Sequence, residues 1–251
     1  MKATFLTDRG QVRNFNEDSG GIFYNQENQL LAIIADGMGG HQAGDVASKM
    51  AVDIVQKLWS ESEGIQSPEE AESWISNILN EINIEIFNES SKNEEFKGMG
   101  TTAVLALCTQ EFVTIGHIGD SRCYINNDNG FQQLTEDHSL VNELVKTGQI
   151  STEDAEHHPR KNIVLKALGT EQSVHADIKS LSWEKSNRLL LCSDGLTDKI
   201  PNDELEVFIN SEKDLLEIGQ TMIEIANERG GEDNISLIII DQSSKEAGEN
   251  P

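Results

Sequence analysis

Four stretches of apolar residues carry an aspartate at one end. LLAIIA leads into Asp36, and VTIGHIG leads into Asp120. RLLLCS leads into Asp194, and Asp233 with Asn234 stands just before ISLIIID. In antiparallel strands, the end of one strand and the start of its neighbour share an edge of the sheet. The four carboxylates can therefore gather at one rim, with glycines nearby that let the backbone approach a ligand.

Carboxylates gathered in this way need a positive partner. A single Asp-Gly pair after a strand, as at 36–37 or 194–195, is also ordinary turn chemistry. Four such acids at one rim, however, would repel one another strongly unless cations neutralised them. Ligands that are all oxygen favour magnesium, manganese or calcium over zinc. We therefore expect a site for hard divalent cations.

The segment TDRGQVRNFNEDS near the N-terminus offers a group that could hold a phosphate. Arg13 lies three residues before the polar triplet Asn16, Glu17 and Asp18. A guanidinium can donate two parallel hydrogen bonds to a phosphate. Glu17 and Asp18 could orient waters bound to the cations. Taken alone, the same stretch is also typical of an exposed loop.

The elements that must position these residues come as clusters of strands separated by long helices. Asn-Gly at 129–130, between two apolar runs, predicts a hairpin. The order of elements favours an α+β domain with mostly antiparallel sheets and helices packed outside them. No GxxxxGK[ST] or GxGxxG motif supports nucleotide binding. Helices are predicted at 43–59, 68–88, 139–146 and 212–228, and strands near 3–7, 20–24, 30–35, 101–108, 112–118, 121–126, 131–134, 188–193 and 235–241.

Length and composition set further limits. The 251 residues, 37% of them hydrophobic, suit one domain with a substantial core, and a disordered tail is expected at 242–251. The net charge of -25 makes nucleic acid and anionic membranes poor partners. No apolar stretch approaches the roughly 20 residues of a membrane span, and the charged N-terminus resembles no signal peptide, so we expect a cytoplasmic protein. Cys108, Cys123 and Cys192 lie in apolar runs and are expected to be reduced core residues.

Seven motifs together resemble the metal-dependent protein phosphatases of the PPM family, the type 2C Ser/Thr phosphatases. The resemblance is strongest to compact bacterial members that oppose Hanks-type, PASTA-type Ser/Thr kinases. It implies one catalytic domain over 1–241, built as a β-sandwich of two antiparallel sheets flanked by helix pairs, with a mobile flap at about 147–170. We also expect a monomer. The motifs, in the family's order, are TDRGQVRNFNED at 7–18, ADGMGGHQAGDVAS at 35–48, GMGTTAV at 98–104, GHIGDSRCY at 116–124, LTEDHSLV at 134–141, LLLCSDGLTD at 189–198 and GGEDNIS at 230–236.

The resemblance implies a cation ligand at each strand-end acid. Asp36 matches the bridging aspartate, and Gly37 matches a ligand that uses its backbone carbonyl. Asp194 and Asp233 match the two remaining carboxylate ligands. Asp120, together with Asp194, matches the position that holds a third ion in bacterial members. The implied cofactors are therefore two Mn²⁺ or Mg²⁺ ions at the catalytic centre, and a third beside them.

The implied reaction is the hydrolysis of phosphoserine and phosphothreonine in proteins. A hydroxide held between two metals attacks phosphorus in line, and no phosphoenzyme forms. Arg13 matches the phosphate-binding arginine, and Glu17 and Asp18 match residues that support metal-bound waters. Met38 stands where many eukaryotic relatives carry a histidine proposed as general acid. The leaving-group proton would then come from His41 or from a metal-bound water.

Partners and alternatives follow from the same comparison. Phosphorylated proteins are the expected substrates, and a cognate Ser/Thr kinase with its targets is the expected partner. The basic pair Arg160 and Lys161 either helps to receive an acidic phosphopeptide or is simply solvated. The alternative function is a non-catalytic relative that binds phosphoproteins as a scaffold, although every matched metal position is filled here. A haloacid-dehalogenase DxDx[TV] motif and an EF-hand loop are both absent.

Overall fold

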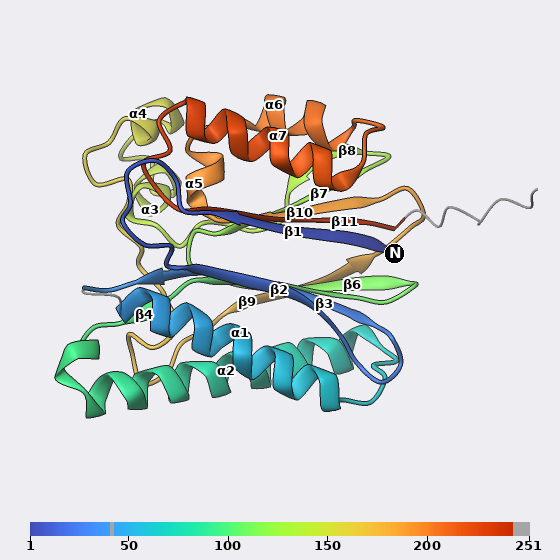
Figure 1. Cartoon of the computed structure of the whole chain (residues 1–251), viewed down its shortest axis with the longest axis horizontal. Coiled ribbons are helices and arrows are strands. Elements are labelled where there is room, and N and C mark those ends of the chain that lie inside the picture. Colours follow the sequence, from blue (N-terminus) through green and yellow to red (C-terminus); the bar gives the residue numbers. More distant parts are fainter. Residues whose placement is uncertain (41–42, 243–251) are drawn as a thin grey trace, which may run out of the picture.

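Two antiparallel sheets lie face to face, and helices cover the outer side of each (Figure 1). The computed structural model describes residues 1–40 and 43–242, so His41 and nearly all of the tail expected at 242–251 lie outside the described residues. Within the described part, none of the helices combines the length and the apolar character that crossing a bilayer requires. The predicted α+β class and the sandwich of two antiparallel sheets are confirmed, whereas the domain limits stay a prediction.

The strands of each sheet come from distant parts of the chain. The two ends of the domain lie side by side, because the first and last strands pair over their whole length. The first sheet contains, in spatial order, β1 (Lys2–Asp8), β11 (Ile235–Asp241), β10 (Arg188–Cys192), β7 (Arg122–Asn127) and β8 (Gly130–Gln133). The second contains β2 (Asp18–Tyr24), β3 (Leu30–Met38), β5 (Ala103–Cys108), β6 (Phe112–Ile118) and β9 (Asp177–Ser182), with β4 (Gly100–Thr101) paired to β3.

Strand β3 is buried on both faces, which explains its unbroken apolar sequence. Alternate residues of a strand point to opposite sides of its sheet. Leu30, Ala32 and Ile34 lie in the core between the two sheets. Leu31 and Ile33 lie in a second core, beneath the helices that cover this sheet. A strand held on both sides fixes the position of the acidic residue at its end.

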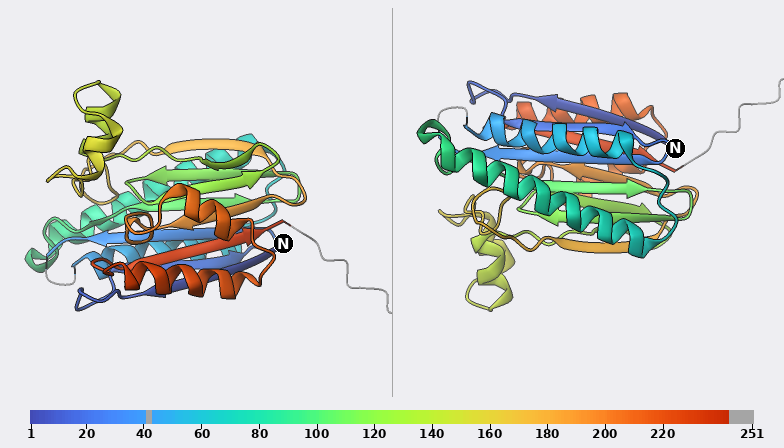
Figure 2. Two further views of the ribbon diagram at one scale, coloured as in Figure 1. Left: turned by 90° about the horizontal axis from the view of Figure 1, so that it is seen from above. Right: turned by 90° about the horizontal axis from the view of Figure 1, so that it is seen from below.

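The helices form one layer on each outer face (Figures 1 and 2). Two long helices cover the second sheet, and the second of them begins at Pro68 after Ser67, whose hydroxyl accepts a hydrogen bond from the N–H of Glu70. Further helices cover the first sheet, and short helices project from one end of the sandwich (Figure 2). The layer on the second sheet contains α1 (Ala43–Glu61) and α2 (Pro68–Lys92). The layer on the first sheet contains α5 (Asp194–Thr197), α6 (Asn202–Ile209) and α7 (Leu215–Glu228). The projecting helices are α3 (Leu140–Lys146) and α4 (Thr152–Glu156).

A few elements differ from the expectation based on sequence. The strand expected at 101–108 is divided into β4 and β5, which separate at Thr102. Strand β9 was not expected, because DIKSLS is largely polar and forms the edge of its sheet. Asp194 opens the one-turn helix α5 rather than a simple turn. The helices predicted at 43–59, 68–88, 139–146 and 212–228 are confirmed as α1, α2, α3 and α7.

Candidate functional site

The structure brings the four strand-end aspartates together at one end of the sandwich. Asp36 lies near the end of strand β3, and Asp120 lies between β6 and β7. Asp194 follows β10, and Asp233 precedes β11. Burial raises the pKa of Asp36 well above its ordinary value, and repulsion from the other three acids and from Asp18 raises it further. The carboxylates are therefore close enough to interact across both sheets.

This group of acids lacks sufficient positive charge of its own. Burial and then repulsion from neighbouring carboxylates raise the pKa of Asp194 well above its ordinary value, although the residue keeps some contact with solvent. Burial is also the largest cause that raises the pKa of Asp18 and of Asp120 to about 6. One oxygen of Asp18 and one of Asp194 are buried without a hydrogen-bond partner. Buried oxygens in excess of their partners fit a hard divalent cation such as Mn²⁺ or Mg²⁺.

Hydroxyl groups connect the strand ends that carry these acids. Thr102 Oγ1 accepts a hydrogen bond from the Asp36 N–H at 3.1 Å, and the Thr102 N–H donates to the Asp36 carbonyl at 2.9 Å. The Thr102 hydroxyl is also 2.8 Å from Ser121 Oγ, directly after Asp120. The backbones of two candidate cation ligands are thus linked through one buried threonine.

Asp18 is oriented by a serine from the other sheet. Ser193 Oγ donates to Asp18 Oδ2 at 2.8 Å and accepts a hydrogen bond from the Ser236 N–H at 3.0 Å. Asp18 also faces Asp36 across the β2–β3 pair. One carboxylate oxygen is fixed in this way, and the other remains for a water or an ion.

Gly37 and Glu17 meet at the beginning of α1. The Gly37 N–H donates to the Glu17 carbonyl at 3.1 Å. A Cβ atom on Gly37 would lie 2.1 Å from the carbonyl oxygen of Gly44, so only glycine fits this close approach. Burial is the largest cause that raises the pKa of Glu17. The two residues that sequence analysis assigned to the site from this region are therefore neighbours.

Arg13 projects from the loop between β1 and β2 and is half-exposed. Its Nη2 lies 2.6 Å from Asp233 Oδ2, so it neutralises one of the clustered carboxylates. A guanidinium at the mouth of a cation site can also bind the oxygens of a phosphate. Arg13 therefore lies between the clustered carboxylates and solvent.

Asn234 holds the loop that carries Arg13, a role that sequence analysis missed. Its Oδ1 accepts a hydrogen bond from the Glu17 N–H at 2.8 Å. Its Nδ2 donates to the carbonyls of Arg9 at 2.8 Å and Phe15 at 3.0 Å. The available signal was a polar residue next to a fully buried strand, since such a residue needs several partners.

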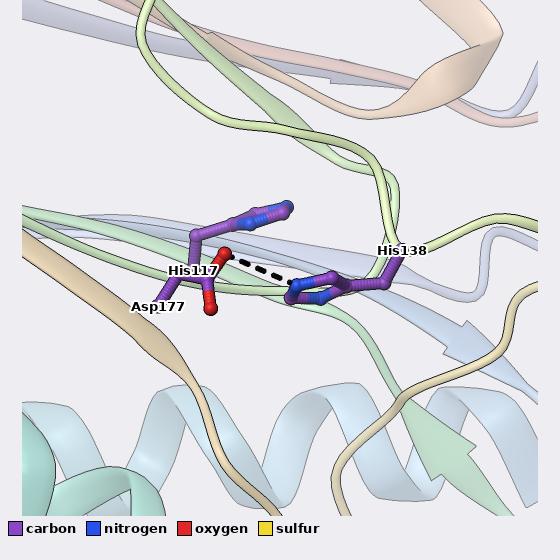
Figure 3. A group of neighbouring side chains, drawn as sticks. All are labelled: His117, His138 and Asp177. Carbon is purple, nitrogen blue, oxygen red and sulfur yellow. Dashed lines mark hydrogen bonds and ion pairs between the residues drawn. The ribbon is translucent and has the colours of Figure 1, made fainter. Parts of the chain in front are cut away.

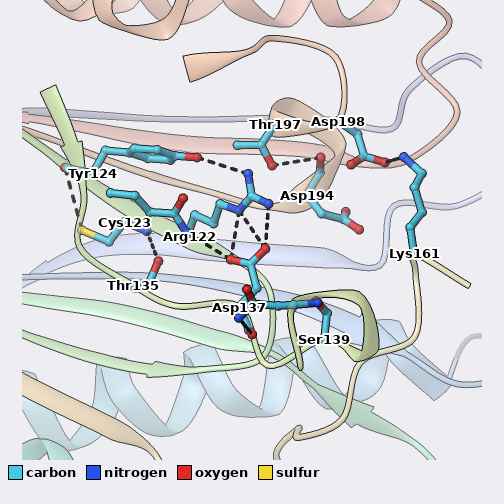
Figure 4. A network of polar contacts seen from close by, with 12 residues as sticks. Arg122, Cys123, Tyr124, Thr135, Asp137, Ser139, Lys161, Asp194, Thr197 and Asp198 are labelled. Carbon is cyan, nitrogen blue, oxygen red and sulfur yellow. Dashed lines mark hydrogen bonds and ion pairs between the residues drawn. The ribbon is translucent and has the colours of Figure 1, made fainter. Parts of the chain in front are cut away.

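A cavity of about 950 Å³ adjoins the rim at Asp120 and Asp194. Residues from α3, α4 and the loop after α4 line one side, and residues around α5 line the other. Arg122 and Asp137 both line this cavity and form an ion pair, with Arg122 Nη2 at 2.6 Å from Asp137 Oδ2 (Figure 4). The cavity offers space for part of a ligand held at the rim.

The segment expected to be a flap, 147–170, contributes to the wall of this cavity. Lys161 Nζ lies 2.5 Å from Asp198 Oδ2 and so connects the segment to the end of α5 (Figure 4). Arg160 is exposed to solvent. The basic pair is therefore divided, since Lys161 already has a carboxylate partner and Arg160 faces water. His41, the other candidate proton donor, lies outside the described residues.

Comparison with known proteins gives consistent matches over nearly the whole chain. The sequence model of the family "Protein phosphatase 2C" matches residues 8–238. The serine/threonine phosphatase stp of Listeria monocytogenes is 47% identical over 248 residues, which are 99% of this chain and 98% of that protein. The crystal structure of Stp1 from Staphylococcus aureus has a TM-score of 0.90 at 41% identity, covering 95% of this chain and 93% of that one. The catalytic domain of the phosphatase PstP, in complex with 2 manganese ions, has a TM-score of 0.83 at 30% identity, covering 96% and 97%.

Proposed function

The chain belongs to the protein phosphatase 2C family, and we propose that its rim of carboxylates is the catalytic centre of this phosphatase. The enzyme hydrolyses phosphoserine and phosphothreonine in proteins and uses divalent metal ions. The observation that supports the site most strongly is the set of buried carboxylates with raised pKa values beside a half-exposed arginine.

Each candidate ligand has a proposed place in this centre. Asp36, the Gly37 carbonyl, Asp194 and Asp233 would hold two Mn²⁺ or Mg²⁺ ions, and Asp120 with Asp194 would hold a third. When bound, these cations would supply Lewis-acid chemistry, which activates water and offsets charge on the phosphoryl oxygens. The two manganese ions in the PstP structure support the first pair.

The chain's own residues then bind and orient the substrate. Arg13 would bind two phosphoryl oxygens and release Asp233 to the cations. Glu17 and Asp18 would orient the attacking water, because both lie beside the acids of the rim and Asp18 has a buried carboxylate oxygen without a hydrogen-bond partner. Asn234 would keep the loop of Arg13 in register. Most of the rate enhancement would come from this positioning and from electrostatic stabilisation.

Phosphate release from a phosphothreonine peptide tests the proposed function. We expect hydrolysis with Mn²⁺ present, loss of hydrolysis after addition of chelator, and recovery after further Mn²⁺. The same peptide without its phosphate serves as the blank. If no phosphate is released with Mn²⁺, with Mg²⁺ or with both, the scaffold alternative replaces the enzyme, and cation and phosphopeptide binding should be measured directly.

Replacement of Arg13 tests its role in substrate binding. We expect Arg13→Ala to lower kcat/KM by about 10- to 100-fold, because a hydrogen bond to a charged group contributes about 1.5–3 kcal/mol. Arg229→Ala is a matched control, since Arg229 is similarly exposed and pairs with Glu204 at 2.7 Å. Steady-state kinetics on the phosphothreonine peptide give the comparison. Equal kcat/KM values in the two variants would remove Arg13 from the proposed site.

The biological setting is proposed from the motif resemblance. We propose that the enzyme acts in the cytoplasm as a monomer, and that it opposes a cognate Ser/Thr kinase and dephosphorylates that kinase's targets. The motifs that support this are those shared with compact bacterial relatives.

A further inference from the structure

Three side chains outside the proposed mechanism lie together near the turn that carries Asp120 (Figure 3). His117 belongs to β6 and is buried, and His138 precedes α3. Their rings stack, with centroids 4.9 Å apart and planes inclined by 27°. Asp177, the first residue of β9, has its Oδ2 at 3.3 Å from His138 Nε2. The group needs an explanation because nothing in the proposed reaction uses it.

The hydrogen bonds of His138 determine where its proton lies. The N–H of Gly119 donates to His138 Nδ1 at 3.1 Å, so this nitrogen is an acceptor and carries no hydrogen. A neutral imidazole has one N–H, which must then be at Nε2 and can donate to Asp177. Burial is the largest cause that lowers the pKa of His138, and it favours this neutral form.

His138 makes hydrogen bonds to both backbone polar groups of Gly119. Its backbone N–H donates to the Gly119 carbonyl at 2.7 Å, while its ring accepts from the Gly119 N–H. Gly119 has a φ of +110°, which glycine tolerates readily. A Cβ atom there would lie 2.5 Å from Thr102 Cβ, so the turn is also confined on its other side. Asp120 follows directly, and its position depends on this turn.

A cation held by the three side chains is the competing explanation. One ligand-type atom from each residue lies within 4.8 Å of the others, and both ring nitrogens of His117 are buried without a partner. A cation on His138 Nε2, however, would displace the proton from that nitrogen. The neutral ring would then carry its hydrogen at Nδ1, directly opposite the N–H of Gly119. The hydrogen bond from Gly119 therefore disfavours a metal site at His138.

We propose that His138 is a positioning residue, which fixes the Gly119 turn through its Nδ1 and its backbone N–H and thereby places Asp120 at the cation site. The structural part of this proposal, the tautomer and the hydrogen bond, is independent of the proposed function. The consequence for cation binding rests on the proposed role of Asp120. Asp177 contributes by accepting a hydrogen bond from the Nε2–H group, which favours the tautomer that leaves Nδ1 as an acceptor.

The tautomer is tested first, on the cation-free wild-type protein. Two-bond ¹H–¹⁵N correlation spectra of ¹⁵N-histidine-labelled protein distinguish a ring protonated at Nε2 from one protonated at Nδ1. We expect His138 to be protonated at Nε2 only. A ring protonated at Nδ1 would overturn the proposal, whether or not the protein is an active phosphatase.

Two variants with opposite geometry test the consequence. In His138→Asn, the short side chain places its amide oxygen near the position of Nδ1, so the bond from Gly119 is kept. In His138→Gln, the longer side chain reaches towards Asp177 and leaves Gly119 without its acceptor. His175→Gln is the control, since His175 is exposed and lies just before β9 in the sequence.

Calorimetric titration with Mn²⁺ and the Mn²⁺ dependence of phosphate release give two readouts. We expect His138→Gln to weaken by about tenfold, a change of about 1.4 kcal/mol, the Mn²⁺ binding step that Asp120→Asn also weakens. His138→Asn and His175→Gln should match the wild type. Wild-type binding in His138→Gln would overturn the proposal. So would a Co²⁺ absorption spectrum that is lost in His138→Gln but retained in Asp120→Asn, because that result would identify a metal site at His138.

If the wild-type protein releases no phosphate, the proposed function is wrong but the proposal about His138 is still open to test. The spectra and the calorimetric titration still decide the role of His138, because neither measurement depends on turnover.

Discussion

Asp36→Asn should abolish phosphate release and, at the same time, stabilise the cation-free protein. Asparagine keeps the size of aspartate but removes the ionisable carboxyl group. Burial and four neighbouring acids raise the pKa of that group. We expect hydrolysis to fall by about 10³-fold or more, because the proposed centre would lose a carboxylate that holds its cations. We expect the free energy of unfolding in chelator to rise, because asparagine cannot ionise in this buried position and does not repel the neighbouring acids.

Thermal unfolding in chelator and in Mn²⁺, measured beside hydrolysis, separates the two effects. Asp194→Asn should behave in the same way, because its carboxylate is held in the same group of acids. Asp128→Asn, in the exposed turn between β7 and β8, is the control and should change neither property. Near wild-type activity in the Asp36 or Asp194 variant would contradict the proposed site. A large loss of stability in chelator would contradict the electrostatic argument.

The residues at the strand ends could be found from sequence because local rules determine them. An apolar run buried on both faces, such as 30–35, cannot end in water without polar residues, and in this chain the polar residue is Asp36. The hairpin at Asn129-Gly130 follows from turn geometry in the same way, and Asn127 pairs with Gly130 as expected. The helix at 68–88 has a capping serine and a proline at its first position.

The residues that were missed depend on contacts between distant segments. Asn234 contacts residues more than 200 positions away, and its role is invisible until β1 and β11 pair. His138 contacts Gly119 only because the loop after β8 returns to the turn after β6. Lys161 looked like half of a basic patch until the fold placed Asp198 beside it. Composition and spacing describe each segment, but these roles require the tertiary structure.

In chelator, the protein should become less stable as the pH rises above about 6.5. Asp36 and Asp194 have folded-state pKa values raised well above the ordinary value, first by burial and then by neighbouring acids. In the unfolded chain these carboxyl groups titrate at about 3.9. Above about 6.5, and up to their raised folded-state pKa values, the folded protein therefore binds more protons than the unfolded one. Stability then falls with rising pH. Saturating Mn²⁺ should remove most of this dependence, since the cations neutralise the ionised carboxylates.

The choice of pH range decides what such an experiment measures. Burial lowers the pKa of His117 to about 4, so this histidine makes stability rise with pH until the unfolded imidazole has lost its proton near about 6.5. Below that pH, His117 opposes the raised carboxylates Asp18 and Asp120, whose pKa values are about 6. Above it, Asp36 and Asp194 dominate the slope. Denaturant unfolding in chelator should therefore be measured at several pH values for the wild type and for Asp36→Asn. We expect the free energy of unfolding of the wild type to fall as the pH rises, and we expect that of Asp36→Asn to fall less steeply. A wild-type free energy that is flat or rises over this range would show that the rim does not carry the unneutralised charge on which the proposed cation site depends.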